Sequence, residues 1–219
     1  FVSLEQPSGT LIYYLDNEGN TIKGEQIING KHLNFGEYGI QVKGNFAPNG
    51  LFYDAITGEP VTNRYVQIND QSNSYNTLEN KDKWFYIGSD SKALKGEQVI
   101  NGVTVFFDKD GVQAKGIFAD DGFYYDKDSG ARVNLGNNQF VQVNGNWYYL
   151  NNEGKIVKGE QVINGNNFYF DKDGKQVKGN FAENGAYYDE NSGVQVTNRY
   201  VNFNNNWYRI GAKGTPLKG

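Results

Sequence analysis

The chain has 219 residues, of which 37% are hydrophobic, and its formal net charge is −4 at pH 7 with a pI of about 5.1. Tyr and Phe supply much of this hydrophobic content, which argues against one thick central core. The negative charge and the lack of a cationic run argue against nucleic acid or an anionic membrane as partner, so a neutral ligand fits better. No apolar stretch approaches the roughly 18 residues that span a bilayer, so we expect no membrane insertion.

Cysteine is absent from the chain, which excludes a disulfide framework and thiolate chemistry. The 28 glycines and 4 prolines indicate many turns, whereas an aromatic content of 15% is too high for a disordered linker. The chain begins at Phe1 without an initiator Met or a signal-peptide pattern, and we expect it to be an excised portion of a longer protein.

From residues 11–15 onward, aromatic segments recur, each followed by a glycine-bearing turn and a segment of β-branched or polar residues. Alternating side chains around a short glycine turn are typical of β-hairpins. The last three read NNFYF-DKDG-KQVKG, AYYD-ENSG-VQVTN and NWYR-IGAKG-TPLKG. Because an isolated hairpin is marginally stable in water, these hairpins must stack on one another. The predicted fold is all-β, an elongated β-solenoid of about ten hairpins, three in each large repeat.

A longer repeat is superimposed on the hairpins and begins at Gly24, Gly96 and Gly159. Each copy opens with Gly-Glu-Gln and closes on Gln-x-Lys-Gly. We therefore expect one repeat domain over residues 1–219, divided approximately into a partial repeat 1–24 and repeats 25–96, 97–159 and 160–219. Three similar sites, rather than one active centre, are implied.

A polar insertion at residues 69–83 interrupts the regularity between Ile68 and Trp84. It stands where a later hairpin has the two-residue turn Asn144-Gly145. We expect a solvent-exposed loop there, because loops on the surface tolerate insertion.

The segments WYYLNNEGKIVKG and GEQVINGNNFYFDKDGKQVKG resemble the repeats in the glucan-binding domain of glucansucrases, the secreted enzymes of lactic acid bacteria that polymerise glucose from sucrose. The likeness spans nearly the whole chain. Its aromatic-then-glycine pattern is shared with choline-binding modules and clostridial toxin repeats. Choline-binding repeats begin with Gly-Trp, whereas Trp84, Trp147 and Trp207 never follow Gly, which argues against an aromatic cage for a quaternary ammonium group.

The resemblance implies a sugar pocket between successive hairpins, with a Tyr as stacking platform and Gln and Lys bonded to glucosyl hydroxyls. A pyranose ring has an apolar face for an aromatic ring and a rim of hydroxyls for polar groups. In Gln-x-Lys the two polar side chains are two positions apart, hence on one face of a strand, with Val42, Ala114 and Val177 pointing the other way. The aromatic segments before each copy share a Tyr 27 residues before the Gln. The predicted sugar-binding residues are Tyr14, Gln41, Lys43, Tyr86, Gln113, Lys115, Tyr149, Gln176 and Lys178.

Other candidate sites are weaker. Asp108 and Asp171 open Asp-Lys-Asp-Gly runs that lack the remaining ligands of a calcium loop, so we expect plain turns. Glu residues at 25, 97 and 160 recur without a partner carboxylate in register, as a glycosidase would need. His32, the single histidine, has no partners for a triad or a metal site. We predict no catalytic residue, metal or cofactor.

These observations predict a non-catalytic, extracellular, secreted or surface-associated module that binds α-glucan polymer and isomalto-oligosaccharides and is covalently joined to a glucansucrase catalytic domain. The alternative is a cell-surface adhesion or toxin-type receptor-binding array that recognises host or cell-wall glycans. The preference among α-1,6, α-1,3 and mixed linkages depends on pocket geometry and stays open.

Overall fold

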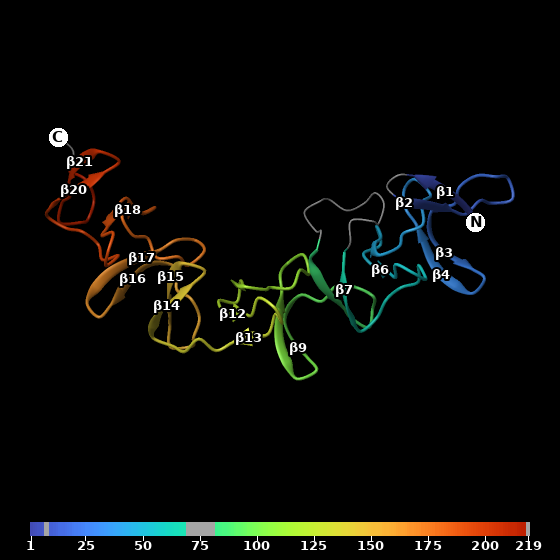
Figure 1. Ribbon diagram of the computed structural model, residues 1–219, viewed down its shortest axis with the longest axis horizontal. Helices are drawn as coiled ribbons and strands as arrows, with labels where there is room; N and C mark the ends of the chain where they lie inside the picture. The colour runs from blue at the N-terminus through green and yellow to red at the C-terminus, as the bar shows by residue number, and fades with distance from the viewer. Residues whose placement is uncertain (7–8, 69–81, 218–219) are drawn as a thin grey trace. The chain divides into compact units, whose positions relative to one another are not determined.

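The computed structural model describes residues 1–6, 9–68 and 82–217 (Figure 1). Within these residues the regular secondary structure consists of β-strands, without a helix. These strands form ten sheets, nine with two strands and one with three, each built from strands consecutive in the chain. The all-β, hairpin-based prediction is confirmed. Of the insertion at residues 69–83, only Asp82 and Lys83 belong to the described residues, so its expected exposure stays a prediction.

The chain divides into two compact units, one of residues 1–116 and 125–132 and the other of residues 117–124 and 133–219. The prediction of one repeat domain is not tested by this division. The strands of the first unit are β1 (Val2–Gln6), β2 (Gly9–Tyr13), β3 (Gly24–Ile28), β4 (Lys31–Phe35), β5 (Asn45–Phe46), β6 (Phe52–Tyr53), β7 (Arg64–Gln67), β8 (Trp84–Ile87), β9 (Gly96–Ile100) and β10 (Val103–Phe107).

Three short strands follow where the division runs, namely β11 (Ile117–Phe118), β12 (Tyr124–Tyr125) and β13 (Arg132–Val133). The remaining strands belong to the second unit: β14 (Gln139–Val143), β15 (Asn146–Leu150), β16 (Gly159–Ile163), β17 (Asn166–Phe170), β18 (Asn180–Phe181), β19 (Tyr187–Tyr188), β20 (Tyr200–Phe203) and β21 (Asn206–Arg209).

Two-residue Asn-Gly turns produce the most regular hairpins. In the β16–β17 hairpin, Asn164 and Gly165 have φ of 49° and 78°, and five residue pairs join the strands, from Gly159 with Phe170 to Ile163 with Asn166. Positive φ at both turn residues is the type I′ geometry, whose twist matches that of the paired strands. Asn and Gly adopt this conformation at low cost, so the dipeptide determines the register.

The strand pairing differs from the prediction at the turns between each aromatic strand and the Gln-x-Lys segment that follows it. The sequence predicts that each aromatic strand pairs with the Gln-x-Lys segment after it, but Phe170 and Gln176 form a single bridge, as do Phe107 with Gln113 and Phe35 with Gln41. The full ladder instead joins the aromatic strand to the strand before it. The Gln-x-Lys segments, residues 41–43, 113–115 and 176–178, thus lie outside the regular strands.

The Asp-Lys-Asp-Gly turns explain this difference. The Oδ1 atom of Asp171 accepts hydrogen bonds from the backbone N–H groups of Asp173 at 2.9 Å and Lys175 at 2.8 Å. Asp108 accepts equivalent bonds from Asp110 and Val112, both at 2.9 Å. Such side-chain-capped turns compete with ladder pairing. Asp108 and Asp171 therefore close turns, as the sequence predicts.

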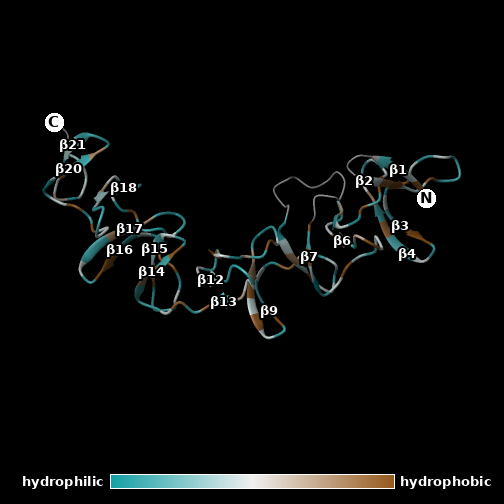
Figure 2. Ribbon diagram, viewed as in Figure 1, coloured by the Kyte–Doolittle hydropathy of each residue, from teal (hydrophilic) through white to brown (hydrophobic). Residues whose placement is uncertain are grey.

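The buried side chains form several small clusters instead of one core. The largest in the first unit combines Phe52, Val61, Val66, Ile68, Phe85 and Ile87, and smaller ones contain Ile100, Val105 and Phe107, or Ile28, Leu33 and Phe35. In the second unit, one cluster contains Ile163, Phe168 and Phe170, and another Tyr187, Val196, Val201 and Ile210. Short hydrophobic segments alternate with hydrophilic ones along the chain (Figure 2). Each cluster lies between neighbouring hairpins, which confirms the predicted stacking.

Candidate functional site

Each Gln-x-Lys segment is held against a strand that contains a predicted platform tyrosine or, in the first copy, directly precedes it. The backbone N–H of Gln176 donates to the carbonyl oxygen of Trp147 at 2.7 Å. The same bond joins Gln113 to Trp84 at 2.8 Å and Gln41 to Ile12 at 2.7 Å. The acceptors stand two positions before Tyr149, Tyr86 and Tyr14; in the second and third copies acceptor and tyrosine therefore share one strand face, whereas Tyr14 directly follows β2. The structure thus joins, in all three copies, the two segments that the sequence predicted to form one site.

The three tyrosines are half-buried and contribute to packing. Tyr149 packs on the cluster of Ile163, Phe168 and Phe170, and its ring lies edge-on to Phe140 with centroids 4.9 Å apart. Tyr86 has the same relation to Tyr65 at 4.9 Å, and Tyr14 to Phe1 at 5.1 Å. Each ring therefore stabilises its hairpin stack, and only its remaining surface is available to a ligand.

The glutamine side chains are directed to the turn of the next hairpin. Nε2 of Gln176 donates to the carbonyl oxygen of Ser192 at 3.2 Å, and Nε2 of Gln113 donates to that of Ser129 at 3.5 Å. Within the described chain, the Oε1 atoms of both residues accept no hydrogen bond. A glutamine amide has two N–H donors and an acceptor oxygen; the turn uses one N–H, so the oxygen and the second N–H remain for a ligand.

Glycine is required where these amides meet the turn. Gly58, Gly130 and Gly193 all have φ of +71°, and at each of them an added Cβ would overlap the Nε2 atom of Gln41, Gln113 or Gln176. The left-handed backbone and the close approach both favour a residue without a side chain. The next hairpin thus completes the wall of each site.

Two tryptophans that the sequence reasoning did not include belong to the same sites. Lys178 Nζ lies 5.9 Å from the ring centroid of Trp147, and Lys115 Nζ lies 5.6 Å from that of Trp84. These distances are within the range of cation–π attraction. The side chains of Trp84 and Trp147 are 37% and 38% exposed. Their recurrence at one strand position was the available signal; in the first copy Ile12 stands there instead.

The assembled groups suit a hydroxylated ring. An exposed indole face matches the apolar C–H face of a pyranose, the lysine ammonium donates to hydroxyl oxygens, and the glutamine oxygen accepts from a hydroxyl. Of the three intervening residues, Val42 and Ala114 are buried and Val177 is half-buried. Gln113 is buried as well, so in the second copy burial does not separate the two faces.

The other candidate residues have structural partners. Glu97 pairs with Arg132 at 2.6 Å, and His32 lies 3.7 Å from Glu25. In the described ranges, no three His, Asp or Glu side chains are grouped to hold a metal ion. Nor do those ranges contain a helix long and apolar enough to cross a membrane.

Comparison with known proteins gives consistent matches. Residues 94–134 and 157–200 match the model of the choline-binding repeat, and residues 138–156 match that of a cell wall binding repeat. The chain is 39% identical over 204 residues to glucosyltransferase-S of Streptococcus mutans serotype c and 35% identical over 216 residues to glucosyltransferase-S of Streptococcus downei. These alignments cover 88% and 94% of this chain, but only 13% and 16% of the two relatives.

A solved structure of alternansucrase in complex with isomaltononaose is 24% identical, with a TM-score of 0.27, and the alignment covers 91% of this chain and 19% of that one. By its hairpins the chain is a β-hairpin repeat protein, and within it residues 94–134, 138–156 and 157–200 match repeats of the choline-binding and cell wall binding type. More particularly, the matches confirm its resemblance to the glucan-binding repeats of glucansucrases.

Proposed function

We propose that this chain is a non-catalytic carbohydrate-binding module that binds α-glucan through repeated pockets. One observation carries the proposal: Gln41, Gln113 and Gln176 make the same backbone bond to a neighbouring aromatic strand. In the second and third copies, the following lysine lies over a half-exposed tryptophan. If this repeated contact served packing alone, it would not need an exposed aromatic ring next to a lysine and an amide oxygen that accepts no hydrogen bond.

The sites we propose combine the predicted Tyr, Gln and Lys with the tryptophans. The third site contains Trp147, Tyr149, Gln176 and Lys178; the second contains Trp84, Tyr86, Gln113 and Lys115. The first contains Tyr14, Gln41 and Lys43 with Ile12 in place of Trp, so we propose that it binds more weakly. Engaging one or two glucosyl units in such a shallow site corresponds to a dissociation constant of about 1 mM, roughly −4 kcal/mol.

The setting of the module is also part of the proposal. The chain spans less than a fifth of the glucosyltransferases it matches. We propose that residues 1–219 act as one repeat domain, covalently joined to a glucansucrase catalytic domain, and that the protein acts outside the cell. Its role is then to hold α-glucan or isomalto-oligosaccharides close to that enzyme.

A pull-down experiment tests this function. The chain is incubated with insoluble dextran and, in parallel, with washed bacterial cell wall. Retention on dextran that isomaltotriose competes away is the expected result. Retention on cell wall alone would contradict the proposal and favour the alternative, an array that reads cell-wall glycans.

A further inference from the structure

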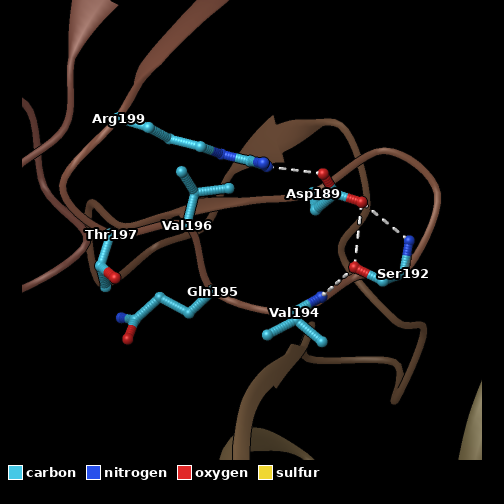
Figure 3. Close-up of a pocket in the computed structure, with 7 residues that line it drawn as sticks. All are labelled: Asp189, Ser192, Val194, Gln195, Val196, Thr197 and Arg199. Atoms are coloured by element: carbon cyan, nitrogen blue, oxygen red, sulfur yellow. Dashed lines mark hydrogen bonds and ion pairs between the residues drawn. The ribbon is translucent and has the colours of Figure 1, made fainter.

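A pocket of about 440 Å³ lies in the second unit, on the hairpin whose Ser192 turn also contacts Gln176 of the third site (Figure 3). Asp189, Ser192, Gln195, Thr197 and Arg199 line it together with two valines, Val194 and Val196. Gln195-Val196-Thr197 occupies in its hairpin the position that Gln176-Val177-Lys178 occupies in the hairpin before. The backbone N–H of Gln195 donates to the carbonyl oxygen of Asn167 at 2.8 Å, which repeats the bond from Gln176 to Trp147.

The side chains, however, differ from those of the Gln-x-Lys sites. The amide of Gln195 is engaged at both ends, because Oε1 accepts from Asn167 at 3.0 Å and Nε2 donates to the carbonyl oxygen of Lys213 at 3.4 Å. The ligand-facing groups are therefore not those of Gln195.

An ion pair forms one wall of the pocket. Arg199 Nη2 donates to Asp189 Oδ2 at 2.7 Å, while Asp189 Oδ1 accepts from the backbone N–H and the hydroxyl of Ser192, both at 2.9 Å (Figure 3). Asp189 is thus saturated and fixes the direction of the guanidinium. The Arg199 guanidinium makes no other hydrogen bond to the described residues, and the hydroxyl of the exposed Thr197 makes none to them. Most of the five guanidinium donors and the threonine hydroxyl remain for a ligand.

The charge balance indicates the class of ligand. Because Asp189 neutralises Arg199, an anion gains little from this wall, whereas the free donors need oxygen acceptors. The threonine hydroxyl both donates and accepts, and the half-buried Val194 provides an apolar surface. These features together fit a neutral ring that carries several hydroxyl groups.

The first unit contains a second example. Arg64 pairs with Asp54, whose Oδ1 accepts from the backbone N–H of Thr57 at 2.7 Å, and Thr62 stands in the position of Thr197. The intermediate copy lacks the arrangement, since Gly136 stands in the position of Arg199. Asn134 there replaces the threonine.

We propose that the Asp189–Arg199 pocket, and its counterpart at Asp54–Arg64, are sugar-binding sites of a second kind, in which an arginine held by a carboxylate and a threonine hydroxyl bind the hydroxyls of a glucosyl unit. This inference rests on the proposed function for the identity of the sugar. It adds to the Gln-x-Lys sites two positions at which one glucan chain is held.

Titration of the chain with isomaltotriose, followed by residue-resolved NMR, tests the inference. We expect the Thr197 amide and the Arg199 Nε–H to shift on addition of sugar, and the same of Thr62 and Arg64. Thr197→Val, which keeps the ion pair and changes an exposed side chain, should weaken binding at this pocket about fivefold, the effect of one lost hydrogen bond. The Trp147 indole titration should not change in that variant.

The outcomes separate this inference from the proposed function. Thr104→Val, on β10 in the first unit, is the matched control and should leave the Thr197 titration unchanged. Shifts at Trp147 without shifts at Thr197 and Arg199 would overturn the pocket and leave the function intact. A response of Arg199 to inorganic phosphate but not to isomaltotriose would overturn the neutral-ligand assignment. If neither Trp147 nor Arg199 responds to sugar, both proposals are wrong.

Discussion

Trp147 and Tyr149 lie two positions apart on β15, yet they have different surroundings. Trp147 is 38% exposed and has Lys178 over its ring, whereas Tyr149 packs on Ile163, Phe168 and Phe170. An exposed ring contributes mainly to ligand binding, and a ring within a cluster contributes also to folding. Variants of the two residues therefore distinguish what this strand contributes to ligand binding from what it contributes to the stability of the fold.

Trp147→Ala should weaken isomaltotriose binding at the third site by about 1 to 3 kcal/mol, the range for lost stacking on a planar partner. The free energy of unfolding should change little. Tyr149→Ala should lower both quantities, because its removal leaves a cavity against buried side chains. Affinity electrophoresis in dextran and urea unfolding measure the two effects.

Trp207 is the matched control for this pair. It is 72% exposed on β21, and in the described part of the chain no lysine lies over its ring. Trp207→Ala should leave dextran mobility unchanged. If Trp207→Ala reduced the retardation by dextran as much as Trp147→Ala does, any exposed tryptophan would contribute to binding, whether or not it lies beside a Gln-x-Lys segment.

The Asp–Arg pairs predict how stability depends on pH. Partial burial opposes ionisation of Asp54, but hydrogen bonds from the Thr57 backbone and from Arg64 outweigh it and lower the pKa to about 2. The backbone N–H of Ser192, followed by Arg199, likewise lowers the pKa of Asp189. A carboxylate with a lowered folded pKa adds stability above its unfolded pKa, and this stability is lost as pH falls through the folded value.

The free energy of unfolding should therefore fall as pH decreases from about 4 to about 2, the interval between the unfolded and folded pKa of Asp54. Asp54→Asn should remove part of this dependence, since Asn does not titrate. Urea unfolding at several pH values measures it. Asp128→Asn, which changes an exposed carboxylate in another turn, is the control, and an identical slope in both variants would contradict the assignment.

At the scale of elements, each site depends on a turn from the next hairpin. Gly193 has φ of +71°, and an added Cβ would overlap Nε2 of Gln176. Gly165, in the Asn-Gly turn between β16 and β17, has φ of +78° but no heavy atom within 4 Å of an added Cβ. The two glycines share a backbone conformation and differ in whether they contact the site.

Both Gly165→Ala and Gly193→Ala should destabilise the fold by about 1 to 2 kcal/mol through the left-handed backbone. Gly193→Ala should in addition displace Gln176 and weaken isomaltotriose binding at the third site severalfold. Calorimetric titration together with urea unfolding compares the variants. Equal binding by the two would show that the turn does not complete the site.

At the scale of the whole molecule, several weak sites are expected to act together on a polymer. Isomaltotriose should titrate as independent weak sites, because a short sugar cannot bridge two of them. Replacing Gln176 and Lys178 together by Ala should remove one of these sites from the stoichiometry. Retention on high-molecular-mass dextran should fall by far more than the same fraction, because effective concentration multiplies the contributions of linked sites.

Retention chromatography on dextran of increasing length measures this difference. Replacement of Asp173 and Lys175 by Ala, in the turn beside the third site, is a control that keeps the number of sites. A decrease in polymer retention that is merely proportional to the number of sites removed would show that one chain does not bridge them.

Local patterns in the sequence determined the class of fold. The Asn-Gly dipeptides and alternating aromatic residues specify hairpins, because the turn residues adopt positive φ at low cost and the strand period is two. The low aliphatic content correctly predicted small clusters instead of one core. The same patterns placed Tyr149, Gln176 and their equivalents in one neighbourhood, since spacing along a repeat is preserved when hairpins stack.

Only the tertiary structure decided which strands form full ladders and which atoms of the site are free. The Asp171 carboxylate takes up backbone N–H groups in its turn, so the next segment makes one bridge and then bonds to the preceding hairpin through Gln176. Gln176 donates to Ser192, and Lys178 lies over Trp147. These contacts join residues on different hairpins, and their geometry depends on how the hairpins pack, which no local pattern in the chain encodes.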